Sequence, residues 1–232
     1  MRMDLRALLA RLREVGELAV VRRPVAPTGE MASVIHALAG RPVLFERVPG
    51  STYRVAANLV ARRETVALGL GVTRERLLLR MVEALRERRA PVRVKARPPC
   101  QEIVEAEVDL GTLPILTHGP RDAGPYVTAA IVVVHDPDTG PNVAFHRLLR
   151  LDHRRFAVRL VEGRGTDTAW RRSTGDLPVA VCLGAPLQAL LAAAMSPAPG
   201  VDEFEIAEAL AATPMARAQT VPLWVPADCE VV

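Results

Sequence analysis

Residues Tyr126 to Leu151 read YVTAAIVVVHDPDTGPNVAFHRLLRL, and this stretch decides the fold of the second part of the chain. Two segments rich in β-branched residues, 127–135 and 142–151, flank the run Asp136-Pro137-Asp138-Thr139-Gly140-Pro141. Proline, aspartate and glycine favour a turn there and do not continue a strand. The stretch therefore predicts a β-hairpin.

Short strands and helices are predicted on both sides of this hairpin. A strand over 103–108 precedes it and a third strand over 155–160 follows it, and such short strands with tight turns are typical of a small antiparallel barrel. From Thr166 onward helices and strands alternate. The predicted elements are a helix around Trp170, a strand over 179–183, helices over 187–195 and 203–212, and a strand over 220–225.

The N-terminal part of the chain predicts a separate α+β unit. Asp4 can cap a helix that ends at Gly16, because Leu5, Leu8, Leu9 and Leu12 recur at helical spacing. The other predicted elements are strands over 18–21, 42–45 and 53–59 and helices over 31–38 and 73–89. Proline and charge mark a change of composition at 96–100, so we predict domains over 1–98 and 99–232.

Composition excludes several classes of protein. Of the 232 residues half are apolar, which is enough for a sizeable core, and no apolar run approaches the length of a membrane helix. The three cysteines form no disulfide or zinc pattern, so a reducing, cytoplasmic location is expected. The net charge of +4 comes from dispersed arginines with few aromatic residues, which argues against nucleic-acid binding.

Specific residues in and around the hairpin resemble those of the UbiD family, decarboxylases that use prenylated FMN. In the hairpin, Asn142 is followed five residues later by Arg147, after an approach through Gly124-Pro125-Tyr126-Val127-Thr128. The resemblance extends over most of the chain. It includes Gly16-Glu17-Leu18, Val108-Asp109-Leu110, Leu113-Pro114, Pro178-Val179-Ala180-Val181, Gly184-Ala185-Pro186 and Val201-Asp202-Glu203.

The resemblance implies a fold and a set of site residues. It implies that the second domain is similar to the split β-barrel of flavin reductases, with flanking helices, and that it holds prenylated FMN or FMN. Asn142 and Glu203 match the family's metal ligands at the flavin phosphate, and Arg147 matches its catalytic arginine. The residues implied to contact the cofactor are Thr128, Asn142, Arg147, Arg164, Ser196 and Glu203.

One implied metal ligand is missing. The family places a histidine before Arg-Gly, and here the aligned run ends in Glu162-Gly163-Arg164-Gly165, so that Gly163 offers no ligand for a divalent ion such as manganese. Three alternatives follow. Glu162 replaces the histidine, or His146 moves in because it shares strand parity with Asn142, or the metal is gone and Arg164 neutralises the phosphate directly.

The resemblance covers only half of a typical family member. The family's catalytic glutamates lie beyond the matched region, and Glu230 matches a different glutamate upstream of them. Our first hypothesis is a flavin-binding part of a decarboxylase for small carboxylic acids, completed by another chain in a homo- or hetero-oligomer. The second is a non-catalytic flavin-binding or assembly protein with the same fold.

Overall fold

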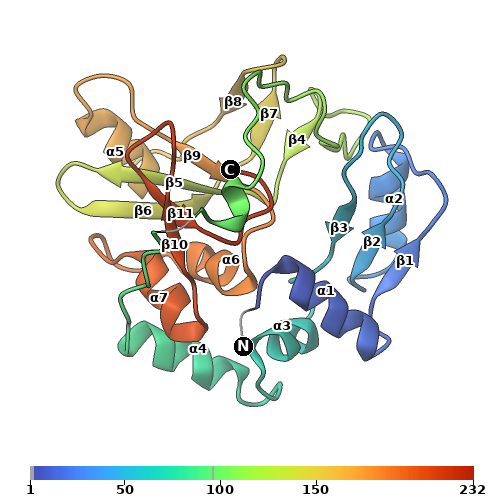
Figure 1. Cartoon of the computed structure of the whole chain (residues 1–232), viewed down its shortest axis with the longest axis horizontal. Helices are drawn as coiled ribbons and strands as arrows, with labels where there is room; N and C mark the ends of the chain where they lie inside the picture. The colour runs from blue at the N-terminus through green and yellow to red at the C-terminus, as the bar shows by residue number, and fades with distance from the viewer. Residues whose placement is uncertain (1–2, 96) are drawn as a thin grey trace.

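The computed structural model describes residues 3–95 and 97–232 and confirms the α+β class (Figure 1). Met1, Arg2 and Ala96, the last of which begins the predicted boundary segment, lie outside the described residues. None of the described helices is long and apolar enough to cross a membrane.

The first unit packs helices against a small mixed sheet of order β1-β2-β3. Strand β1 runs parallel to β2, and β3 runs antiparallel to it. The predicted cap is confirmed, because the Asp4 side chain accepts a hydrogen bond of 2.8 Å from the backbone N–H of Ala7. The elements are α1 (Leu5–Glu14), β1 (Ala19–Val21), α2 (Glu30–Ala37), β2 (Val43–Phe45) and β3 (Val55–Ala57).

Two helices complete this part of the chain, and both correct the sequence analysis. Helix α3 (Arg63–Leu70) was not predicted, since its glycine and threonine weaken the helical pattern. Helix α4 (Leu77–Arg86) is shorter than the predicted helix over 73–89: Thr73, which could cap a helix from its position in the sequence, lies before its start, and no side chain caps it. Helix α4 packs against helix α7 (Glu203–Leu210) of the second unit.

Within the described residues, the second unit has three small sheets with flanking helices (Figure 1). Their orders are β6-β5-β9, β4-β7-β8 and β10-β11. The elements are a 3₁₀ turn (Pro99–Gln101), β4 (Tyr126–Val127), β5 (Ile131–Asp136), β6 (Gly140–Phe145), β7 (Leu148–Arg150), β8 (Phe156–Val158), α5 (Gly165–Arg172), β9 (Ala180–Cys182), α6 (Leu187–Ala194), α7 (Glu203–Leu210), β10 (Met215–Arg217) and β11 (Trp224–Pro226).

The predicted hairpin is confirmed as β5 and β6, which pair antiparallel from Ile131 with Phe145 to Asp136 with Gly140. Its two predicted strands are nevertheless too long, because the chain leaves this sheet before β5 and after β6, and β4 and β7 pair with each other instead. The predicted strand over 103–108 is wrong: no strand forms there, and the side chain of Ile103 is 80% exposed.

Strand β5 is the centre of a three-layer arrangement that positions the site. Ile131 and Val133 face a core shared with α6 and α7, whereas Val132 and Val134 face a second core shared with α5. All four side chains are buried, which explains why the run has no polar alternation. Among the described residues the strand pairs do not close into one ring, so the split barrel stays a prediction.

The turn of the hairpin is fixed to helix α5. The Asp136 carboxylate accepts hydrogen bonds from the backbone N–H groups of Asp138 and Thr139, at 2.8 and 3.0 Å, and from the Arg172 guanidinium at 3.0 Å. Burial would raise the pKa of Asp136, but these bonds outweigh it and hold the pKa below its ordinary value. These contacts join the turn of the hairpin to the last residue of helix α5.

Candidate functional site

Strand β6 forms an open sheet edge at which two helices begin. It lies at the end of the order β6-β5-β9, so one side of its backbone faces away from the sheet. On that side the N–H of Val143 donates to Glu203 Oε2 at 3.0 Å. Glu203 is the first residue of α7, and α5 begins with Gly165 on the opposite face of the same sheet. The positive ends of both helix dipoles therefore flank this edge.

Glu203 is an acid in an apolar environment. It is 6% exposed, and burial raises the pKa of Glu203 to about 7, although the bonds from backbone N–H groups oppose this rise. The adjacent Asp202 carboxylate, whose oxygen caps α7 by accepting from the N–H of Phe204, raises it further. A buried carboxylate of this kind is more stable as an anion when a cation lies next to it.

On the other face, Asn142 and His146 meet at one hydroxyl group. Asn142 Nδ2 donates to Thr166 Oγ1 at 3.2 Å, and His146 Nε2 lies 2.9 Å from the same oxygen. Burial lowers the pKa of His146, which favours the neutral ring. Both bonds can form if the Asn142 amide donates to the Thr166 hydroxyl and this hydroxyl donates to the unprotonated Nε2 of His146. Asn142 Oδ1 then remains available as an acceptor for another partner.

Gly165 makes room for this amide. A Cβ atom at position 165 would overlap Asn142 Oδ1 and lie 2.7 Å from its Cγ, so the observed position of the Asn142 side chain requires glycine there. Thr166 and Gly165 were both missed from the sequence. The available signal was their position at the start of the helix around Trp170, directly after Arg164.

Oxygen groups of the kind that a hard divalent ion takes lie on both faces of this edge. They are Asn142 Oδ1 on one face and the Glu203 carboxylate on the other, whereas His146 Nε2 is already engaged by the Thr166 hydroxyl. Among the described residues, no group of three or more histidine, cysteine, aspartate or glutamate side chains is arranged to hold a metal. A site here therefore depends on the asparagine and on ligands from the phosphate or water.

In the described part of the chain, none of the remaining predicted residues is hydrogen-bonded to the side chain of Asn142 or Glu203. Arg147, Arg164 and Ser196 are exposed, and none of them pairs with a residue that the structure describes through its side chain. Ser196 has a left-handed backbone, with φ of 45°, in the loop between α6 and α7. Thr128 lies elsewhere, in a cleft between the two units.

In the run that lacks the family histidine, Glu162 and Gly163 contact helix α5 and not Asn142. The Glu162 side chain is 90% exposed and lies 3.8 Å from the Arg171 guanidinium. Gly163 has φ of 73°, which a histidine would adopt only under strain, and its N–H donates to Asp167 Oδ2 at 2.9 Å. Of the three alternatives, His146 is the side chain that the structure brings to Asn142.

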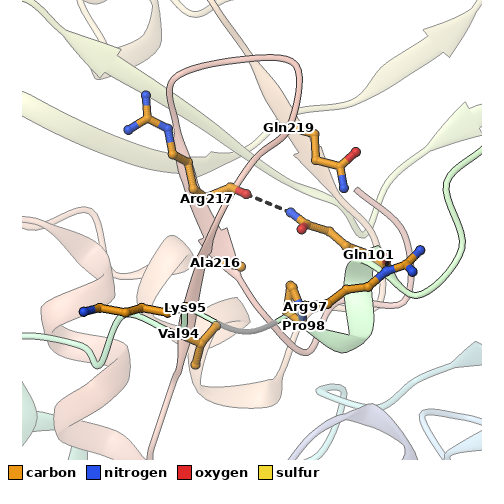
Figure 2. A pocket seen from close by; sticks show the side chains of 8 residues that line it. All are labelled: Val94, Lys95, Arg97, Pro98, Gln101, Ala216, Arg217 and Gln219. Atoms are coloured by element: carbon orange, nitrogen blue, oxygen red, sulfur yellow. Dashed lines mark hydrogen bonds between the residues drawn. The ribbon is translucent and has the colours of Figure 1, made fainter.

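A separate hollow of about 430 Å³ lies beside β10 (Figure 2). Gln101 Nε2 donates to the Arg217 carbonyl at 2.7 Å, and Arg97 donates to the carbonyls of Gln101 and Glu102. These contacts hold the segment that joins the two units against β10. None of the predicted site residues lines this hollow.

Replacing Glu203 by glutamine should change how stability depends on pH. Because the folded-state pKa of about 7 lies above the ordinary glutamate value of 4.5, folded protein binds the extra proton, and the unfolding free energy falls as pH rises from about 4.5 to 7. The loss should amount to about 3 kcal/mol. We expect the unfolding free energy of Glu203→Gln, measured by urea denaturation, to lack this decrease between pH 5 and pH 8.

Glu205→Gln on the same helix is the matched control. Its unfolding free energy should still fall as pH rises. An equal decrease in Glu203→Gln and in the unsubstituted protein would show that another group titrates.

The sequence matches the models of both UbiD domains, so the chain belongs to the UbiD family. Residues 9–85 match the 3-octaprenyl-4-hydroxybenzoate carboxy-lyase N-terminal domain, and residues 92–232 match the 3-octaprenyl-4-hydroxybenzoate carboxy-lyase Rift-related domain. The resemblance predicted from the hairpin is thus confirmed.

Individual relatives carry decarboxylase names. The chain is 37% identical over 216 residues to anhydromevalonate phosphate decarboxylase of Methanosarcina mazei, covering 92% of this chain and 50% of that protein. The structure is similar to HmfF of Pelotomaculum thermopropionicum in complex with prFMN, with a TM-score of 0.92, 34% identity and coverage of 99% and 56%.

A third similar structure is the apo 3,4-dihydroxybenzoic acid decarboxylase AroY of Klebsiella pneumoniae, with a TM-score of 0.89 and 25% identity; the match covers 99% of this chain and 53% of that one. The chain thus spans about half the length of these relatives.

Proposed function

We propose that this chain binds prenylated FMN or FMN at the edge of β6. It would act as the cofactor-binding part of a reversible, non-oxidative decarboxylase of aromatic or α,β-unsaturated carboxylic acids, completed by another chain. The observation that carries the proposal is the approach of Asn142 and Glu203 to one sheet edge between two helix N-termini. HmfF structures in complex with prFMN and with FMN support the choice of ligand.

The phosphate end of the flavin would be held by charge and by helix dipoles. The exposed Arg164 immediately precedes α5 and is available for a charge-assisted bond to phosphate. Asn142 and Glu203 would share a divalent ion such as manganese with the phosphate, and His146 would complete or orient this set. Ser196 would contribute from the loop before α7.

The ring end would lie toward Arg147 and Thr128. When bound, prenylated FMN would supply the electron sink for loss of carbon dioxide. Arg147 would bind and orient the substrate carboxylate, because a guanidinium is a poor proton donor. Among the described residues Arg147 has no acidic partner, so the proton donor would come from the partner chain.

The second candidate is a non-catalytic flavin-binding or assembly protein. The absence of an acidic partner for Arg147 within the described part of the chain favours it. The two candidates share the cofactor site and differ in whether a chain with the remaining half of the UbiD fold exists. Domains over 1–98 and 99–232 and an oligomeric assembly are part of both proposals.

Flavin binding is the direct test. Protein co-produced with a flavin prenyltransferase should carry prenylated FMN or FMN, visible in its absorption spectrum and mass spectrum. Arg164→Ala should weaken FMN binding about 10- to 100-fold, the range expected for one charge-assisted bond. Arg159→Ala, which changes an exposed arginine directly after β8, is the control. A colourless protein that does not bind FMN at millimolar concentration would refute the proposal.

A further inference from the structure

The three cysteines of the chain gather at one place in the fold, although they are far apart in the sequence. Cys182 is the last residue of β9, Cys229 lies just after β11, and Cys100 is the middle residue of the 3₁₀ turn. Cys182 and Cys229 belong to the same buried core, and Cys100 packs against it. Residue spacing does not reveal this cluster, because the thiols come together only in the folded chain.

Backbone hydrogen bonds hold the three cysteine-bearing segments together. The N–H of Cys100 donates at 3.1 Å to a carbonyl of the segment that follows β11 (Figure 1). The N–H of Glu230 donates to the carbonyl of Leu183 at 3.0 Å. These two residues directly follow Cys229 and Cys182 in the chain. The cluster is therefore fixed by the backbone and does not depend on the position of one mobile side chain.

The three thiols differ in their access to solvent. Cys182 is 0% exposed and Cys229 is 3% exposed, whereas Cys100 is half-buried and is the one that a small solute can reach. Burial raises the pKa of the Cys100 thiol, and burial together with the neighbouring Cys182 thiol raises the pKa of Cys229. Because the thiolate is the reactive form, the cluster should react slowly at neutral pH and faster as pH rises.

We propose that this cluster is an oxidative modification site, at which a hydroperoxide joins Cys182 and Cys229 in a disulfide and Cys100 is the point of entry. The hydroperoxide transfers one oxygen atom to Cys100, which becomes a sulfenic acid, and leaves as an alcohol, or as water if it is hydrogen peroxide. Cys229 then attacks the Cys100 sulfur. Water is released and a Cys100–Cys229 disulfide forms.

A thiol–disulfide exchange completes the reaction. Cys182 attacks the sulfur of Cys229, the Cys182–Cys229 disulfide forms, and Cys100 leaves as a thiol after taking up a proton. In the whole sequence two thiols lose two electrons and two protons, and the hydroperoxide takes them up. Cys100 is therefore regenerated, and the oxidation is stored between the two buried residues.

The disulfide would strengthen the junction between the two units. Glu230, which directly follows Cys229, accepts hydrogen bonds at 2.8 Å from Nε and Nη2 of Arg6 on helix α1. Cys182 pairs with Ile131 of β5 and so belongs to the sheet that carries the hairpin. The bond would thus tie this sheet to the segment that holds α1. The thermal midpoint should rise by about 5 to 10 °C.

Mass spectrometry of the full chain is the direct test. The folded protein is incubated with hydrogen peroxide at pH 8, the remaining thiols are alkylated in denaturant, and the digest is searched for disulfide-linked peptides. We expect Cys182 linked to Cys229 as the main product, and dithiothreitol should reverse both this link and the rise in thermal midpoint. Three thiols that all remain free, or Cys100 oxidised to a sulfinic acid without any disulfide, would overturn the proposal.

Variants separate entry through Cys100 from direct oxidation of the buried pair. Cys100→Ser should form the Cys182–Cys229 disulfide at least tenfold more slowly, whereas Glu102→Gln, which changes an exposed side chain just after the 3₁₀ turn and keeps all three thiols, should form it at the unsubstituted rate. Equal rates in Cys100→Ser and the unsubstituted protein would overturn the role of Cys100.

A variant of the last thiol traps the intermediate. Cys182→Ala should stop the reaction at the Cys100–Cys229 disulfide, and Cys182→Val replaces it if the cavity left by alanine prevents folding. A folded variant at position 182 that forms no such disulfide would contradict the proposed order of steps.

Discussion

The purified chain, loaded with flavin, is expected to convert aryl or acrylic acids 10²- to 10⁴-fold more slowly than the complex with its partner. This is the usual contribution of a positioned general acid. Arg147 is exposed and lacks an acidic neighbour in the part of the chain that the structure describes, so under the proposed function the partner would supply the proton donor. Carbon dioxide release under anaerobic conditions measures the difference.

Arg147→Ala provides the internal control. It should abolish turnover in the complex and change little in the single chain, since the single chain already lacks the acid that the arginine would assist. Robust turnover by the single chain that depends on Arg147 would mean that the proton donor lies within residues 1–232.

Gly165→Ala is expected to reduce FMN affinity at least tenfold with little loss of stability. The new methyl group would occupy the position of the Asn142 amide oxygen, so Asn142 would have to leave its hydrogen bond with Thr166. Alanine is favoured over glycine in a helix by up to about 1 kcal/mol, which offsets part of the cost of this movement. FMN titration should therefore show a clear change, whereas thermal melting should show little.

Gly175→Ala is the matched control, because a Cβ at position 175 would have no atom within 4 Å and the backbone there needs no left-handed angle. Unchanged FMN affinity in Gly165→Ala would show that the Asn142 side chain does not contact the cofactor. A large loss of stability would instead assign Gly165 a purely structural role.

The sequence correctly predicted those features that depend only on residues close to one another in the chain. The cap at Asp4 and the turn at Asp136 involve side chains within three residues of the backbone groups that they bind, and both are present. The strand over 103–108 failed because β-branched residues favour a strand only when a neighbouring strand is available, and Ile103 faces solvent.

The candidate site was predictable only in part, for a similar reason. The family pattern identified Asn142 and Glu203, whose approach to one edge the structure shows. It did not identify Thr166, which is 24 residues from Asn142 and bonds to it only because α5 folds back over the hairpin. Residue spacing also could not decide whether Glu162 or His146 lies closer to Asn142. That depends on the direction that the chain takes in the turn before α5.

The bond between Glu203 and Val143 also bears on self-association. An edge strand with free N–H groups is a template for pairing with another copy of the chain. On β6, Pro141 has no N–H, and the N–H of Val143 is taken by the Glu203 carboxylate. The same carboxylate that is proposed to serve the cofactor thus also blocks edge-to-edge aggregation, so a substitution that removes it exposes the strand to oligomers and precipitation.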